Sequence, residues 1–218
     1  MIDAIVIAAG EGRRLRPITE RWPKPVLPID GRPVIATLVR QLMDEGLGPI
    51  TVVTGYLGAQ VEELLSGIDL RYARQPSPDG SLDAVRRALE AGAARPALIC
   101  AADTVFSRGD LATVANAEED GAIAVREDAR KDRIEVEDGL VRQVVSPDAT
   151  LPLSSAPLWL LTDRIDLEHL PGPPYELAAA FQRAIDAGQR IAAVEIGPTR
   201  DLTEPADLVL ENFPYLGG

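Results

Sequence analysis

The chain has 218 residues, enough for one sizeable domain, and a formal net charge of −12. Binding along the phosphate backbone of nucleic acid requires a basic excess, so this class of protein is excluded. No apolar run is long enough to span a membrane, the sequence opens without the pattern of a secretory signal, and a single cysteine excludes an intrachain disulfide. We therefore expect a cytoplasmic protein that binds neither nucleic acid nor a membrane, and we leave a homo-oligomer open.

Strand-like and helix-like segments alternate over residues 1–120. The predicted elements are strand 2–9, helix 33–46, strand 50–54, helix 57–66, strand 69–73, helix 81–92, strand 97–102 and helix 110–118. This alternation predicts a doubly wound, mostly parallel sheet with helices on both faces, which is a three-layer α/β/α Rossmann-like fold.

From about residue 121 the pattern changes to shorter strands, which predicts a small β-rich region. The predicted elements are strands 122–125, 133–136, 140–145 and 158–161, a hairpin turn at 137–139, helix 175–187, strand 191–196 and a last helix near 204–211.

A glycine-containing loop follows the first predicted strand and reads Ala8-Ala9-Gly10-Glu11-Gly12-Arg13-Arg14-Leu15-Arg16-Pro17. Glycines let the backbone turn close to a ligand, and the N–H groups of such a loop attract anions. The loop is not a Walker A motif, because no Gly-Lys-Ser/Thr closes it, and a dinucleotide fingerprint would need glycine in place of Leu15. It therefore predicts a site for the phosphates of a nucleotide.

A lysine between two prolines, Lys24, follows this loop. The chain has twenty arginines and only two lysines, so its cationic positions are arginine almost throughout. A lysine here indicates a compact point charge, which fits against a crowded phosphorus atom better than a guanidinium does.

Two aspartates are candidate metal ligands. Asp103 follows the apolar strand 97–102, at the edge of the sheet where ligands of doubly wound folds bind. Carboxylates in such a place hold divalent metals bound to phosphates, with a helix cap as the alternative. Asp201 follows another strand, and its alternative is a turn or cap residue. Thr203 is a plausible N-cap of the last helix.

These segments together resemble the sugar-1-phosphate nucleotidylyltransferases, whose opening motif runs Gly-x-Gly-Thr-Arg-Leu-x-Pro-x-Thr and then Pro-Lys-Pro. Segment 75–80 resembles the base-recognition loop of glucose-1-phosphate thymidylyltransferases. Ala101-Ala102-Asp103-Thr104 resembles the family's metal motif, and segment 201–208 resembles the motif Asp-x-Gly-Thr-Pro-x-Asp-Leu near the end of its members. The resemblance is strong over 1–105 and weak between 121 and 195. It implies one nucleotidyltransferase domain over 1–218, with a nucleotide-binding half at 1–120 and an acceptor-binding half at 121–218.

The resemblance implies condensation of a nucleoside triphosphate with a phosphorylated small-molecule acceptor and release of pyrophosphate. Arg14 would hold the pyrophosphate, Lys24 would neutralise charge at the α-phosphorus, and Asp103 with Asp201 would hold Mg²⁺ as cofactor. The amide of Gln75 offers a donor and an acceptor, which suits thymine or uracil. The implied nucleotide-binding residues are Ala8, Ala9, Gly10, Glu11, Gly12, Arg13, Gln75, Gly80 and Ser81.

The acceptor side departs from the family. Val145-Ser146-Pro147-Asp148 stands where the family has Glu-Lys-Pro, and Ser155-Ala156-Pro157 where it has Asn-Ala-Gly. Arg13 stands in place of a threonine, and its role is open. Candidate acceptor-binding residues are Glu176, which begins a shortened version of a family motif, and Trp159, for which core packing is the alternative.

Three hypotheses follow. In the first, the enzyme uses dTTP or UTP with a sugar 1-phosphate. In the second, it uses CTP with a small phosphorylated alcohol or phosphonate, because the sugar motif is missing and an aromatic Trp159 would suit a quaternary ammonium, as in choline-phosphate cytidylyltransferases. In the third, the chain is a non-catalytic module that senses nucleotide sugars; the presence of Arg14, Lys24, Asp103 and Asp201 together counts against it.

Overall fold

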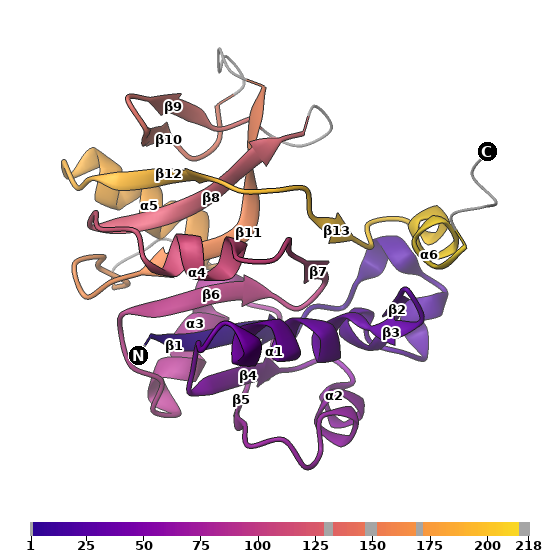
Figure 1. Ribbon diagram of the computed structural model, residues 1–218. Helices are drawn as coiled ribbons and strands as arrows, with labels where there is room; N and C mark the ends of the chain where they lie inside the picture. Colours follow the sequence, from indigo (N-terminus) through magenta and orange to yellow (C-terminus); the bar gives the residue numbers. More distant parts are fainter. Residues whose placement is uncertain (1, 129–132, 147–151, 169–171, 214–218) are drawn as a thin grey trace.

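The computed structural model describes residues 2–128, 133–146, 152–168 and 172–213. Its main feature is one nine-stranded sheet with the order β5-β4-β1-β6-β11-β8-β12-β10-β9 (Figure 1). The first four strands of this order are parallel to one another: β5 (Arg71–Arg74), β4 (Ile50–Thr54), β1 (Asp3–Ala8) and β6 (Ala97–Ala101). The predicted fold class is confirmed.

The other five strands form the β-rich half. β11 (Leu153–Leu161) is antiparallel to β6 and to β8 (Gly121–Glu127), so it joins the two halves of the sheet. β12 (Ile191–Glu195) is parallel to β8. The hairpin of β9 (Glu135–Glu137) and β10 (Leu140–Gln143) pairs with β12 through β10 and forms this edge of the sheet. The turn predicted at 137–139 is confirmed.

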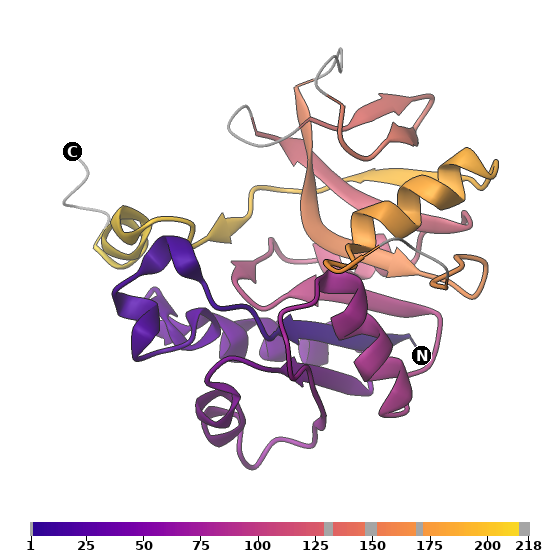
Figure 2. The ribbon, with the colours of Figure 1, turned by 180° about the vertical axis from the view of Figure 1, so that it is seen from behind.

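Helices cover both faces of the sheet. On one face lie α1 (Val34–Asp44), α2 (Gly58–Leu64) and α4 (Asp110–Ala115). On the other lie α3 (Ser81–Glu90) and α5 (Leu177–Asp186), which Figure 2 shows in front. A strand covered on both faces is largely apolar, as β6 is along its whole length, and this is why the sequence predicted it as an apolar run.

The strand predicted at 158–161 begins earlier, at Leu153. Its register against β8 shifts between Ser155 and Trp159. Pro157 has no N–H to donate within this stretch, and a shifted register breaks the alternation of side chains. The sequence pattern of a strand therefore covers only the regular end of β11.

Short elements beyond the carboxyl ends of β1 and β6 were not predicted, because a helix or strand of two or three residues has no periodicity to detect. They are the 3₁₀ helices η1 (Arg13–Leu15), η2 (Ile18–Glu20) and η3 (Lys24–Val26), the hairpin of β2 (Pro28–Ile29) and β3 (Arg32–Pro33), and the pair of β7 (Thr104–Val105) with β13 (Arg200–Asp201).

The last helix, α6 (Pro205–Asn212), has Glu204 as its N-cap, so the prediction of Thr203 is wrong. The carboxylate of Asp207 accepts hydrogen bonds from the backbone N–H groups of Thr203 (2.7 Å) and Glu204 (2.8 Å). Because Glu204 and Asp207 cap the helix, the hydroxyl of Thr203 is not used for capping and is available to the cavity described below.

Among the described residues, no helix combines the length and the apolar character that crossing a bilayer requires.

The loop between β5 and α3 packs tightly against Tyr175, and this gives a test of the fold. A Cβ atom at Gly80 would lie 2.2 Å from the carbonyl oxygen of Tyr175, whereas one at Gly109 would have no atom within 4 Å. Both glycines have positive φ, +102° and +90°. We expect Gly109→Ala to lower the free energy of unfolding by about 1–2 kcal/mol and Gly80→Ala by about 1–3 kcal/mol more. Urea titration of both variants measures this, and equal losses would contradict the packing described.

Candidate functional site

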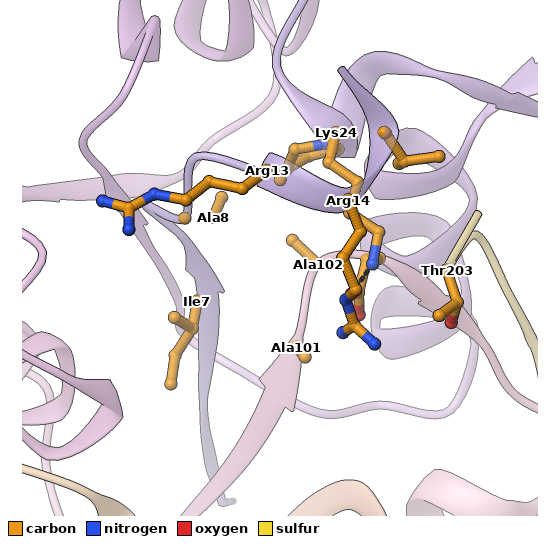
Figure 3. Close-up of a pocket in the computed structure, with 13 residues that line it drawn as sticks. Ile7, Ala8, Arg13, Arg14, Lys24, Ala101, Ala102 and Thr203 are labelled. Carbon is orange, nitrogen blue, oxygen red and sulfur yellow. Dashed lines mark hydrogen bonds and ion pairs between the residues drawn. The ribbon is translucent and has the colours of Figure 1, made fainter. Parts of the chain in front are cut away.

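The candidate site consists of two adjoining cavities beyond the carboxyl ends of β1 and β6. The smaller cavity has a volume of about 330 Å³ and the larger about 510 Å³. Figure 3 shows the smaller cavity, with side chains from the glycine loop, from η3 and from the end of β6 around it. Both cavities are lined by Arg14, Lys24, Ala101, Asp103 and Thr203.

The glycine loop is shaped by Gly12, which has φ +61°. A Cβ atom there would come within 3.0 Å of Thr19 and 3.2 Å of Lys24, so the loop needs glycine at this position. The hydroxyl of Thr19 donates to the carbonyl oxygen of Gly12 at 2.9 Å and holds the turn. The loop thereby brings η1 and Lys24 to the same cavity.

Adjacent arginines of η1 extend in different directions (Figure 3). Arg13 donates from Nε to Glu11 Oε2 at 2.7 Å, and its side chain is 72% exposed. This hydrogen bond lowers the pKa of Glu11. Arg14 has no hydrogen bond or ion pair from its side chain to any described residue, so its charge is available for an anion in the cavities. Arg13 and Arg16 both pair with Glu11, so among the three arginines of the loop Arg14 is the one without an ion pair to a described residue.

An ion pair joins Lys24 Nζ to Asp103 Oδ2. Both side chains are largely shielded from solvent, with 14% of Lys24 and 30% of Asp103 exposed. Thr104 Oγ1 donates to the other carboxylate oxygen of Asp103 at 3.0 Å. The alternative of a helix cap does not apply to Asp103, because the next helix, α4, has Gly109 as its N-cap.

The two candidate metal ligands come together across the β7–β13 pair. Asp201 lies opposite Thr104 in this pair, so it is next to Asp103, and both aspartates line the larger cavity. No cluster of three His, Cys, Asp or Glu residues that could hold a metal is found in the described ranges. Two carboxylates with room for phosphate oxygens nonetheless fit Mg²⁺, which is commonly held by one or two carboxylates and its substrate's phosphates.

Gln75 is buried, and its amide nitrogen donates to the carbonyl oxygen of Gly80 at 2.9 Å and to Asp83 Oδ2 at 3.0 Å. Both partners are acceptors, so the orientation of the amide is fixed and only Oε1 remains for a ligand. The expectation that this amide offers both a donor and an acceptor is therefore wrong for this conformation. Gln75, Gly80 and Ser81 line neither of the two cavities.

The two candidate acceptor residues lie in different places. Glu176 accepts a hydrogen bond from Ser81 Oγ at 2.6 Å, which ties the start of α5 to the start of α3, and it lines neither cavity. Trp159 lines the larger cavity, and its ring lies edge-on to that of Phe181 with centroids 4.8 Å apart. Trp159 thus belongs to both the core and the cavity wall.

The wall beside Trp159 is made by residues that the sequence marked only as departures from the family: Ser155, Ala156 and Pro157. Thr104 and Thr203 also line the larger cavity. The sequence marked these positions only through their place in family motifs or as a cap, and it assigned them no ligand contact, because small and hydroxyl side chains have no diagnostic spacing. In the departing segment 145–148, Pro147 and Asp148 lie outside the described residues.

The described residues thus form a Rossmann-like sheet with an arginine-bearing glycine loop, a lysine and two carboxylates beyond the carboxyl ends of its parallel strands. Residues 4–194 match the family model of the MobA-like NTP transferase domain, and the chain belongs to this family. The family resemblance predicted from the sequence is confirmed.

Similar proteins use different substrates. The chain is 34% identical over 87 residues to the N-acetylmuramate alpha-1-phosphate uridylyltransferase of Neisseria meningitidis serogroup B, a match that covers 38% of this chain and 37% of that protein. It is 32% identical over 108 residues to the 2-aminoethylphosphonate cytidylyltransferase of Lancefieldella rimae, covering 48% and 44%. The matched segments thus span less than half of either relative.

The structure is also similar to that of the inositol-1-phosphate CTP transferase from T. maritima, with a TM-score of 0.81 and 20% identity over 95% of this chain and 91% of that one. At this identity the similarity concerns the fold.

The Lys24–Asp103 ion pair places an ammonium group where a divalent cation would compete for the carboxylate. We therefore expect Lys24→Met to bind Mn²⁺ more tightly than the wild type in the absence of nucleotide, by about tenfold at the effective dielectric of a partly buried site. Electron paramagnetic resonance of free Mn²⁺ measures the affinity. The control is Arg40→Met, which removes the exposed ion pair of Arg40 with Asp44 and should leave Mn²⁺ binding unchanged. Equal Mn²⁺ affinity in all three proteins would show that Asp103 is not a metal ligand.

Proposed function

We propose that this protein is a nucleotidyltransferase that joins a pyrimidine nucleoside triphosphate to a phosphorylated small-molecule acceptor and releases pyrophosphate. The observation that carries the proposal is the convergence of Arg14, Lys24, Asp103 and Asp201 on two adjoining cavities. A module that only senses nucleotides would not need this full set. Membership of the MobA-like NTP transferase domain family and the transferase names of the relatives support the same reaction class.

In the proposed reaction, a phosphate oxygen of the acceptor attacks the α-phosphorus in line, and the bond from this phosphorus to the bridging oxygen of the β-phosphate breaks. Arg14, whose charge is not compensated within the described residues, binds the departing pyrophosphate. Lys24 lies between the two cavities and neutralises the charge that develops around the α-phosphorus. No covalent intermediate with the protein is needed, because positioning and electrostatic stabilisation supply the catalysis.

Asp103 and Asp201 are the residues that would hold Mg²⁺ in this proposal. The ion, when bound, supplies positive charge to the triphosphate oxygens. Lys24 must release Asp103 before the carboxylate can take up a cation, so in the loaded enzyme its ammonium group is free to bind phosphate oxygens.

For the substrates, the base loop resemblance favours UTP or dTTP, with a sugar 1-phosphate as acceptor. The second candidate is CTP with a small phosphorylated alcohol or phosphonate. It is favoured by the sequence at 145–148, which lacks the Glu-Lys-Pro of the family's sugar motif, and by Trp159, which offers an aromatic ring to the larger cavity. The relatives include transferases of both kinds.

The reaction and its substrates are tested by pyrophosphate release with Mg²⁺, using UTP, dTTP or CTP against sugar 1-phosphates, polyol phosphates, choline phosphate and 2-aminoethylphosphonate. We expect release that depends on one nucleotide and one acceptor class together. The proposal would be contradicted if pyrophosphate were released from a triphosphate in the absence of any acceptor, or if no combination of nucleotide and acceptor released pyrophosphate.

Loss of the ammonium group should affect chemistry more than binding. We expect Lys24→Met to lower kcat by about 10²–10³-fold, the usual cost of removing a group that stabilises transition-state charge. The dissociation constant of the nucleotide, measured by calorimetry, should change by less than about tenfold, since Arg14 and the loop amides remain. Arg40→Met is again the control with unchanged kcat. Unchanged turnover in Lys24→Met would remove this residue from the mechanism.

A further inference from the structure

Asp201 lies on the two-residue strand β13, which pairs with the equally short β7 in a two-stranded sheet. A pair of two-residue strands gives little rigidity by itself. A carboxylate that must meet a small cation needs its backbone held within a fraction of an ångström. The side chains on either side of Asp201 therefore matter for its position.

Arg200, the preceding residue, uses every nitrogen of its guanidinium group. Nη1 and Nη2 donate to the two carboxylate oxygens of Asp30, the Nη2 bond measuring 2.9 Å. Nε donates to Glu211 Oε2 at 2.5 Å, and Nη2 also donates to the carbonyl oxygen of Glu211 at 3.1 Å. The hydrogen bond from Arg200 lowers the pKa of Asp30, so the pair stays charged at neutral pH. The planar guanidinium thus joins three segments of the chain.

These partners connect Arg200 to the segment that bears the cations of the site. Asp30 lies in the turn between β2 and β3, directly after the glycine loop and η3. The end of α6 is fixed to the same hairpin, because Asn212 accepts from Gly31 N at 2.8 Å and donates to Pro28 O at 2.8 Å. Figures 1 and 2 both show α6 beside the β2–β3 region.

On the other side of Asp201, Leu202 is fully buried in a small core with Leu15 of η1 and Leu27. Asp201 lines the larger cavity, whereas neither Arg200 nor Leu202 lines either cavity. One neighbour is held by ion pairs and the other by burial. Asp30 and the buried leucines lie on the chain segment that carries Arg14 and Lys24, and Glu211 of α6 is the further partner of Arg200.

We propose that Arg200 is a positioning residue that sets Asp201 against the Mg²⁺ of the nucleotide complex through its bonds to Asp30 and Glu211. This proposal depends on the function proposed above. Arg200 lines neither cavity and does not touch substrate. Exposed ion pairs contribute little to global stability, and the side chain of Arg200 is 40% exposed, so its removal should displace Asp201 without unfolding the protein.

The test measures Mn²⁺ affinity by electron paramagnetic resonance, with the protein saturated by the α,β-methylene analogue of the pyrimidine triphosphate that the wild type turns over. We expect Arg200→Met to weaken Mn²⁺ binding by about tenfold, the scale seen for residues that orient metal ligands. Its kcat at saturating Mg²⁺ should fall less than its affinity for the metal. Arg200→Lys, which keeps the charge, should recover part of the affinity. The control is Arg190→Met, which removes a bidentate pair with Glu119 and should leave Mn²⁺ affinity unchanged.

A double-mutant cycle separates positioning from general stability. In the Asp201→Asn background, Arg200→Met should cause no further loss of Mn²⁺ affinity. A further loss of the same size there, or unchanged affinity in Arg200→Met alone, would overturn the proposal for Arg200 and leave the proposed function standing. If Asp201→Asn itself leaves Mn²⁺ binding unchanged, the metal site of the proposed function is wrong, and the role of Arg200 fails with it.

Discussion

The ion pair between Lys24 and Asp103 connects the cation-bearing loop to the end of the central strand β6, across 79 positions of sequence. The ammonium and carboxylate groups compensate each other while the site holds no substrate, which keeps two partly buried charges from being left unpaired. A triphosphate and its cation would replace each half of this pair with a new partner of the correct sign. The pair therefore joins the two sides of the site, and in the proposed function it supplies two groups for the reaction.

The two walls of the site differ in chemistry. The nucleotide wall carries Arg14, Lys24, Asp103 and Asp201, which are suited to phosphates and a divalent cation. The opposite wall is formed by β11, where the shifted register between Ser155 and Trp159 places a proline and an aromatic ring at the larger cavity. The chain is similar to enzymes for uridylyl and for cytidylyl transfer. The proposed function assigns the reaction groups to the first wall and recognition of the acceptor to the second.

Structural features that depend on residues close together in the sequence were predictable from the sequence. The alternation of strands such as β1 and β6 with helices predicted a parallel sheet, and Gly12 and Asp103 follow these two strands at recognisable positions. Features that depend on distant residues were not predictable. Glu176 bonds to Ser81 across 95 positions, and Arg200 bonds to Asp30 across 170 positions. These contacts arise from tertiary packing, and no local pattern of polarity records them.

The most direct test of the central claim is the phosphorus spectrum of the product, since nucleotidyl transfer makes a new bond between two phosphorus centres through oxygen. With the protein, Mg²⁺, the active triphosphate and its acceptor, the account predicts that ³¹P NMR will show pyrophosphate together with a pair of mutually coupled diphosphate doublets, or their phosphonate equivalent. The same sample with Lys24→Met should show neither at matched times. A nucleoside diphosphate and inorganic phosphate as the products would contradict the account, because they would mean attack at the γ-phosphorus.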